Sequence, residues 1–314
     1  MLLIDLVFLI LFLIQTVVGL LENSILLMLF VSVFTSHRHH KKPTDLIVAY
    51  LTVANTGILI TQVAPGMILA IRWENAMDVV GCQIALFIRR VARGLSICNT
   101  CLLSVFQAIT ISPSTSRWAQ IKPSLSKYIV SIFLFFWVLN FMVEMNILKS
   151  IEVSQNVTLT LHVDRRRCCL NMIRGNYLNN VVFLTAKVIR DAVFVFLMSW
   201  ASGYMVIVLY RHHKQVQHIH STSLSPKSSA ETKATQTILF LVTCFVSFYC
   251  INSSLTLALN FFEEDDLRLY DPVLFLGSCY SFFGPLVLIS NDPRVSKLLC
   301  PLGRERALSA FISQ

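Results

Sequence analysis

The sequence predicts an all-α fold, a single bundle of seven transmembrane helices, and three observations support that prediction. Seven long apolar runs follow one another through 314 residues, and no segment between them is large enough for a separate domain. Each run matches the length of about 20 residues with which a helix crosses a bilayer core of ~30 Å, where the backbone must satisfy its own hydrogen bonds. The composition, 55% hydrophobic and 14% charged with a mean hydropathy of +0.67, is unlike that of a soluble domain.

The first apolar run is interpreted as a retained helix rather than a secretion signal. It has no basic leading segment, carries Asp5 near its start, and is about twice as long as the apolar region of a usual signal. Glu22, halfway along it, is interpreted as a residue that pairs helices. The single domain 1–314 is expected to contain helices at about 6–33, 46–71, 79–111, 128–148, 181–210, 237–262 and 272–290, followed by a cytoplasmic tail at 291–314.

Proline and glycine predict bends in two of these helices. Pro65 and Gly66 lie within the second helix, and Gly284 and Pro285 lie within the seventh. A proline inside a helix frees a backbone carbonyl and kinks the axis. Bent helices in a bundle are consistent with a rearrangement driven by a ligand.

Charged side chains in the third helix indicate function, because charge inside a membrane is costly. Arg89, Arg90 and Arg93 lie about two to three turns inward of Cys82, at the outer start of this helix. Arg89, Arg93 and Ser96 follow the spacing i, i+4, i+7 and therefore share one face. We expect this polar stripe to point into the bundle.

The fourth and fifth helices place further charges at a comparable depth. The fifth helix carries Lys187, Arg190 and Asp191, and Glu144 lies near the end of the fourth. Two interpretations remain open. These groups line a ligand pocket together with the arginines, or they pair with one another, for instance Arg93 with Asp191 or Glu144, and fix the packing of the helices.

The distribution of Lys and Arg predicts the orientation, since short cytoplasmic loops are enriched in them. Taking the segment after the first helix as cytoplasmic places fourteen of the 26 basic residues on that side. They are Arg38, Lys41, Lys42, Arg117, Lys122, Lys127, Arg211, Lys214, Lys227, Lys233, Arg294, Lys297, Arg304 and Arg306. The amino terminus is therefore expected outside, and the net charge of +9 indicates contact with membrane lipids rather than with nucleic acid.

A disulfide and a glycan are expected on the outer side. Cys82 lies at the outer start of the third helix, and Cys168 and Cys169 lie in the long outer loop before the fifth. A bridge from Cys82 to either of them would tie this loop across the mouth of the bundle. The same loop carries an Asn-Val-Thr sequon at Asn156, a glycosylation acceptor only on the luminal side.

The sequence argues against an enzyme and disfavours a transporter. It contains no His-Glu-x-x-His, Gly-x-Ser-x-Gly or Gly-rich phosphate loop, and we expect neither a metal nor a cofactor. Seven spans with no internal repeat do not divide into the two equal halves that many transporters have. A small-molecule transporter remains the weaker alternative.

The segment from Arg93 to Pro113, which begins Arg-Gly-Leu-Ser-Ile-Cys-Asn-Thr-Cys, resembles the third-helix signature of vomeronasal type-1 receptors. Further matching stretches run from the first helix to the seventh, so the resemblance covers essentially the whole chain. They include Gln15-Thr-Val-Val-Gly19, Thr44-Asp-Leu-Ile47, Lys214-Gln-Val-Gln-His-Ile219, Glu231-Thr-Lys-Ala-Thr-Gln-Thr-Ile-Leu239 and Phe245-Val-Ser-Phe-Tyr249.

Two absences fit the same family. Phe106, Gln107 and Ala108 stand where rhodopsin-like receptors carry an Asp-Arg-Tyr triplet, and the seventh helix lacks an Asn-Pro-x-x-Tyr pattern. Vomeronasal type-1 receptors lack both elements. Glu22 departs from the family, in which the residue before Asn23 is usually small.

The resemblance implies a multi-pass receptor of the plasma membrane. It would bind a small pheromone-like ligand in the outer half of the bundle and activate a heterotrimeric G protein of the inhibitory class. A bitter-taste-type chemoreceptor is the alternative. The ligand-binding hypothesis names Arg89, Arg90, Arg93, Lys187, Arg190 and Asp191, and three arginines favour anionic or hydrogen-bonding compounds such as sulfated steroids. The G-protein contact hypothesis names Gln107, Arg211, Lys214 and Lys233.

Overall fold

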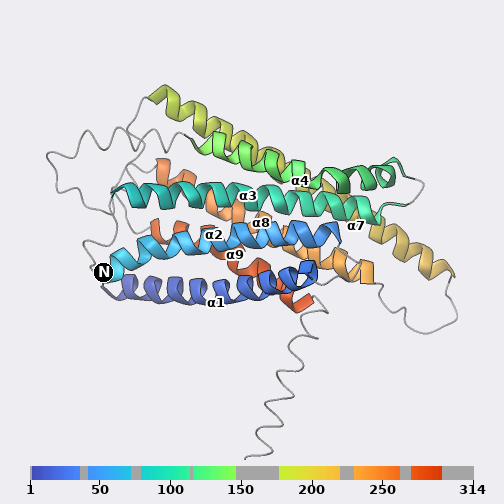
Figure 1. The fold of residues 1–314 in the computed structure, drawn as a ribbon, viewed down its shortest axis with the longest axis horizontal. Coiled ribbons are helices and arrows are strands. Elements are labelled where there is room, and N and C mark those ends of the chain that lie inside the picture. The colour runs from blue at the N-terminus through green and yellow to red at the C-terminus, as the bar shows by residue number, and fades with distance from the viewer. Residues whose placement is uncertain are drawn as a thin grey trace, which may run out of the picture.

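The computed structural model describes residues 2–35, 42–71, 79–113, 116–145, 177–219, 230–261 and 270–291. All regular secondary structure in these ranges is helical, and the helices alternate in direction along one long axis (Figure 1). They are α1 (Leu2–Thr35), α2 (Pro43–Ile71), α3 (Val79–Ile111), α4 (Arg117–Glu144), α7 (Tyr177–Ile219), α8 (Ala230–Phe261) and α9 (Tyr270–Asn291).

Six of these helices contain a stretch that is long and apolar enough to cross a membrane, and α9 contains a shorter one, Phe275–Asn291. The prediction of an all-α, seven-helix membrane bundle is confirmed. The helical backbone of α2 continues through Pro65 and Gly66, and that of α9 through Gly284 and Pro285, so neither pair ends its helix.

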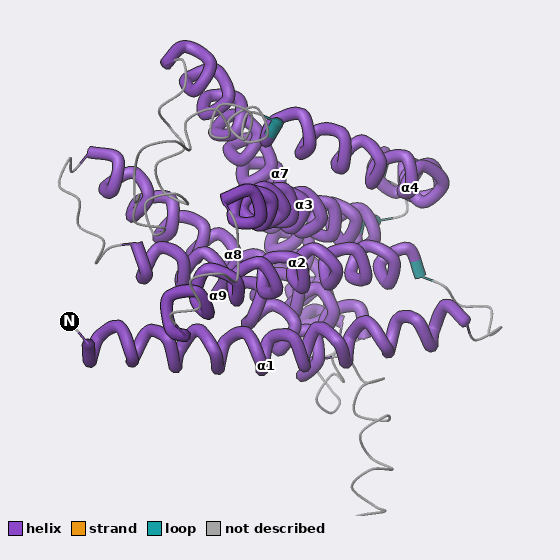
Figure 2. Tube along the Cα trace, turned by 60° about the vertical axis from the view of Figure 1, so that its left-hand side comes forward, coloured by secondary structure: helices purple, strands orange, loops and turns teal. Residues whose placement is uncertain are grey.

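Helix α3 occupies the centre of the bundle (Figure 2). It packs against α2, α4, α7 and α8, and 83% of its membrane-spanning window is buried, against 17% for that of α7. The core cluster around it includes Leu51, Leu103, Met198 and Leu241. A helix surrounded by others can carry polar groups that would be costly against lipid. This position explains how α3 can carry the three arginines considered above.

Three helices extend about two turns or more beyond their apolar runs. Helix α4 begins at Arg117 rather than about residue 128, α7 continues to Ile219 rather than about 210, and α8 begins at Ala230 rather than about 237. The added turns are polar and lie at the end of the bundle expected to be cytoplasmic. The apolar run marks the part of a helix that lies in lipid, whereas the hydrogen-bonded helix itself continues into water.

Neutral hydrogen bonds join α3 to α2 and α9 across the middle of the bundle. Ser96 Oγ donates to Asn55 Oδ1 at 2.9 Å, and Ser281 Oγ donates to the same oxygen at 3.5 Å. The hydroxyls of Thr100 and Tyr280 lie 3.0 Å apart. These contacts fix the rotation of α3 about its axis and so determine which of its side chains face the cavity described next.

Candidate functional site

A buried charged network centres on Arg190 of α7, whose side chain is 4% exposed. Its Nε and Nη2 each lie 2.8 Å from Asp191 Oδ1, and its Nη1 donates to Asn140 Oδ1 at 2.9 Å and to Glu144 Oε1 at 3.5 Å. Glu144 Oε2 lies 3.9 Å from Arg90 Nη1. Charges can be buried when they are paired and hydrogen-bonded, so this network ties together α3, α4 and α7.

Tyr249 of α8 links this network to Arg93. Its hydroxyl donates to Asp191 Oδ2 at 3.1 Å, and Arg93 Cζ lies 5.8 Å from the centre of its ring. The two carboxylates that the sequence offered as partners for Arg93, those of Asp191 and Glu144, bind Arg190 instead. None of the ion pairs found in the described residues includes Arg93. The guanidinium of Arg93 is instead directed at an aromatic face, which is a favourable arrangement for a cation.

Gly94 allows α3 to approach α4 and α7 closely at this level. A Cβ at Gly94 would lie 2.8 Å from Asn140 Cγ and 2.9 Å from Arg190 Nη1, and it would collide with the Asn140 carboxamide oxygen. Any side chain at this position would therefore displace the groups that hold Arg190. The charged network therefore requires a residue without a side chain at position 94.

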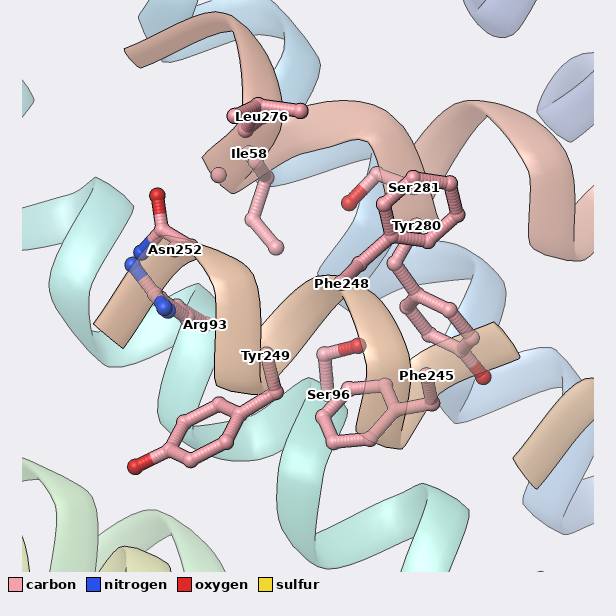
Figure 3. Close-up of a pocket in the computed structure, with 11 residues that line it drawn as sticks. Ile58, Arg93, Ser96, Phe245, Phe248, Tyr249, Asn252, Leu276, Tyr280 and Ser281 are labelled. Carbon is pink, nitrogen blue, oxygen red and sulfur yellow. The ribbon is translucent and has the colours of Figure 1, made fainter. Parts of the chain in front are cut away.

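A small cavity of about 30 Å³ lies beside Arg93, between α2, α3, α8 and α9 (Figure 3). Its wall combines the rings of Phe245, Phe248, Tyr249 and Tyr280 with the polar groups of Arg93, Ser96, Asn252 and Ser281. Rings surrounding a few convergent polar groups are typical of a small-molecule site. The groups of this wall suit a molecule that stacks on aromatic rings and accepts hydrogen bonds from a guanidinium.

Gly277 of α9 makes room for the polar groups of this cavity. A Cβ there would lie 3.2 Å from Asn252 Oδ1 and 3.7 Å from Arg93 Nη1. The amide and the guanidinium thus converge on the same point of the α9 backbone.

The opposite end of α3 is connected by neutral groups. Gln107 Nε2 donates to Thr235 Oγ1 of α8 at 2.9 Å, and both residues are buried. The hydroxyls of Ser112 and Tyr204 of α7 lie 3.0 Å apart. One candidate G-protein contact is therefore enclosed between helices. The other three, Arg211, Lys214 and Lys233, are exposed.

The remaining candidate residues are distributed around the network. Arg89 and Lys187 are half-buried, and the side chain of Arg90 is 38% exposed. The side chain of Cys82 and the residues Cys168, Cys169 and Asn156 lie outside the part of the chain that the structure describes. The disulfide and the glycan stay predictions.

Several residues of the site were not anticipated from the sequence, among them Asn140, Tyr249, Asn252 and Gly94. Asn140 and Asn252 interrupt apolar runs in the fourth and sixth spans, and this is a signal that could have drawn attention to them. Tyr249 and Gly94 give no such signal, because an aromatic residue or a glycine is common in membrane helices. Their roles depend on which helices face one another.

Comparison with known proteins identifies the family. Residues 7–300 match the model of the family described as "Vomeronasal organ pheromone receptor family". The chain is 34% identical over 287 residues to vomeronasal type-1 receptor 3 of Homo sapiens, covering 90% of each chain. It is 35% identical to vomeronasal type-1 receptor 4 of Pongo pygmaeus (90% of this chain, 94% of the relative) and 32% identical to vomeronasal type-1 receptor 90 of Rattus norvegicus (91% of each).

The match runs through all seven helices, including the arginine-bearing α3 and the apolar spans on which the membrane prediction depends. Relatives that agree over nine-tenths of both chains share the fold and the class of receptor. The chain belongs to the vomeronasal type-1 receptor family and is a multi-pass, G-protein-coupled chemosensory receptor of the plasma membrane, not an enzyme.

Proposed function

We propose that this receptor binds a small anionic or hydrogen-bond-accepting semiochemical against Arg93, in the half of the bundle where α3 begins. In the expected orientation this half faces outward. The occupied receptor then activates an inhibitory-class G protein at the other end. The observation that carries the proposal is that Arg93 lines an aromatic cavity and forms none of the ion pairs found in the described residues.

The neighbouring charges explain why Arg93 is suited to this role. Arg190 has three acceptors in Asn140, Glu144 and Asp191, so its donors are already engaged. The guanidinium of Arg93 faces the ring of Tyr249 in the cavity wall, at 5.8 Å. A sulfate or carboxylate entering the cavity would gain charge-assisted hydrogen bonds from Arg93 without breaking an existing ion pair.

We assign different roles to the other residues of the binding hypothesis. Arg190 and Asp191 hold α7 and α8 in position around the cavity, because they bind each other and Tyr249. Arg89, Arg90 and Lys187 lie closer to the start of α3 or of α7, and they raise the local concentration of anions at this end of the bundle.

The size of the cavity links ligand binding to helix movement. A volume of about 30 Å³ accommodates water but not a steroid, whereas sites for molecules of that size usually measure about 300 Å³ or more. Side chains of α8 and α9 must therefore move apart to admit a ligand. A ligand that binds only the widened arrangement shifts the equilibrium towards it, as a receptor requires.

The test of the ligand site compares two forms of one compound, a steroid sulfate and the parent alcohol. Cells expressing an amino-terminally tagged receptor and a promiscuous G protein are imaged for calcium release, with surface staining. We expect Arg93→Gln to weaken the response to the sulfate by about tenfold or more and to change the response to the alcohol less. Arg93→Lys, which keeps the charge, serves as the matched control and retains part of the preference.

An unchanged ratio of sulfate to alcohol potency in Arg93→Gln, at normal surface level, would reject Arg93 as the anion site. The G-protein class is tested separately, without the promiscuous subunit, as inhibition of cyclic AMP synthesis before and after pertussis toxin. The proposal expects the toxin to abolish the response. Persistence of the response would exclude the inhibitory class.

A further inference from the structure

The polar groups of the cavity beside Arg93 lie at two depths (Figure 3). Arg93 approaches the α9 backbone at Gly277, nearer the start of α3 and of α9, and these two helices run in the same direction. Ser96 follows Arg93 by three residues, about 5 Å further along α3. Ser281 follows Gly277 by four residues, about 6 Å further along α9. The cavity therefore has a cationic end and, deeper in the bundle, an end with two hydroxyls, Ser96 and Ser281, called here the serine pair.

The serine pair faces the cavity as hydrogen-bond acceptors. Both hydroxyls donate to one atom, Asn55 Oδ1 of α2, at 2.9 Å from Ser96 Oγ and 3.5 Å from Ser281 Oγ. A hydroxyl has a single proton and two lone pairs, so an oxygen that donates to Asn55 can still accept. No hydrogen bond donated to either oxygen is found among the residues that the structure describes. The serine pair can therefore take a hydrogen bond from a ligand, but its protons are already in use.

Aromatic rings form the wall between the two ends of the cavity. The ring of Tyr249 faces Arg93, and Phe245, one turn away on α8, lies nearly parallel to it with ring centres 6.2 Å apart. Phe245 also meets Tyr280 edge-on at 4.5 Å, beside the serine pair. Flat rings pack well against such faces and edges. One six-membered ring with a substituent at each end spans the distance from the guanidinium to the serine pair.

We propose that the ligand carries two functional groups on one ring, an anion that binds Arg93 and, across the ring, a hydroxyl or N–H group that donates to the serine pair. The inference rests on the proposed function, because it takes the cavity beside Arg93 as the ligand site. An ether or carbonyl oxygen in the second position would face lone pairs without a proton between them. The serine pair thus discriminates among compounds that share the same anionic group.

The experiment compares three phenyl sulfates that differ only at the para position, which carries a hydroxymethyl, a methoxymethyl or an acetyl group. The purified full-length receptor is melted over a concentration series of each compound. Unfolding is followed with a thiol-reactive dye that reports exposure of the buried Cys98 and Cys101, and the rise in Tm with concentration gives Kd. We expect the hydroxymethyl compound to bind about tenfold more tightly than the other two, the effect of one hydrogen bond in an apolar site.

Variants separate the two ends of the cavity. Ser96→Ala and Ser281→Ala each remove one acceptor, and each should lower the preference for the hydroxymethyl compound about threefold. Arg93→Gln should weaken the binding of all three sulfates and keep the preference. Ser104→Ala is the matched control and should change neither, because Ser104 is buried in the same helix outside the cavity and donates to the Thr100 carbonyl at 2.8 Å. Melting without ligand shows whether each variant is folded.

Equal affinities for the three compounds in the wild-type receptor would overturn the inference and leave the proposed function standing. An undiminished preference in both serine variants would also overturn it, because the donor group would then bind elsewhere. If no phenyl sulfate binds while a steroid sulfate still acts through Arg93, the single-ring ligand class is rejected. If the response to the steroid sulfate does not depend on Arg93 either, the proposed function fails and this inference fails with it.

Discussion

The two ends of α3 are held in different ways. Where the helix begins, Arg90 reaches Glu144 while Arg190, Asp191 and Tyr249 join α7 and α8 to the same charged network. Where the helix ends, an amide-to-hydroxyl bond connects α3 to α8 and a pair of hydroxyls connects it to α7. The first arrangement consists of interdependent charges, and the second of separate neutral contacts.

The difference indicates which end can open. Removing one member of a buried ion pair leaves an uncompensated charge and costs about 3 to 5 kcal/mol, whereas a neutral hydrogen bond contributes about 1 kcal/mol. Helix movements in receptors need two arrangements of similar free energy. We therefore expect the charged end to keep its helices together around the ligand while the neutral end separates to admit a G protein.

The largest effect is expected for Asp191→Ala. The substitution leaves Arg190 buried with one carboxylate partner fewer and removes the acceptor of the Tyr249 hydroxyl. We expect a loss of about 3 kcal/mol in stability and a fall in surface level. Unfolding of the purified receptor can be followed with a thiol-reactive dye, because Cys98 and Cys101 are buried and free. Asp191→Asn, which keeps an oxygen acceptor, should lose less, and an Asp191→Ala receptor as stable as wild type would contradict the role given to the network.

A smaller loss, about 2 kcal/mol, is expected for Gly94→Ala. The new methyl group would overlap Asn140 and lie 2.9 Å from Arg190 Nη1, so the charged network would have to shift. Gly203→Ala in α7 is the matched control, since nothing lies within 4 Å of its Cβ and alanine favours a helix. The same dye assay compares the two. Equal melting temperatures would show that α3 can move away at no cost.

Hydropathy and charge in the sequence predicted the seven helices, the arginines of α3 and the charges of α7 facing them. Which arginine would be engaged was not predictable, because Arg93 and Arg190 carry the same charge at a comparable depth. The outcome depends on the rotation of α7, which directs Arg190 towards Asn140 and Glu144. That rotation is set by the packing of helices distant in sequence.

The same limit applies at the opposite end of α3. Gln107 was expected to face a G protein because of its place in the chain, and the residue across from it, Thr235, lies 128 positions away. Sequence spacing fixes which residues share a face of one helix, but not which helix that face meets.

The neutral end should respond to Thr235→Val with a change in signalling rather than in folding. The variant keeps the shape of the side chain and removes the acceptor of Gln107 Nε2. We expect a stability loss of about 1 kcal/mol and a rise in ligand-independent G-protein activation, measured as nucleotide exchange in the absence of ligand. Thr237→Val is the control, because the Thr237 hydroxyl makes an exposed hydrogen bond within α8, to the Lys233 carbonyl. Basal exchange equal to that of the control would mean that the bond between Gln107 and Thr235 does not hold the two helices together.

The smallest effect, and the only gain, is expected for Glu22→Gln in α1. Glu22 Oε2 is buried with no hydrogen-bond partner among the described residues, and none of the ion pairs found there includes it. A lone carboxyl inside a membrane carries a desolvation cost that a neutral amide reduces, so the variant should be more stable by up to about 1 kcal/mol. The dye assay compares the stability of Glu22→Gln with that of Asp191→Asn. Both variants replace a carboxylate by an amide, but the carboxylate of Asp191 has partners. A loss of stability in Glu22→Gln as large as that in Asp191→Asn would show that the two carboxyls are equally engaged, and that the contrast between paired and unpaired charge does not describe this bundle.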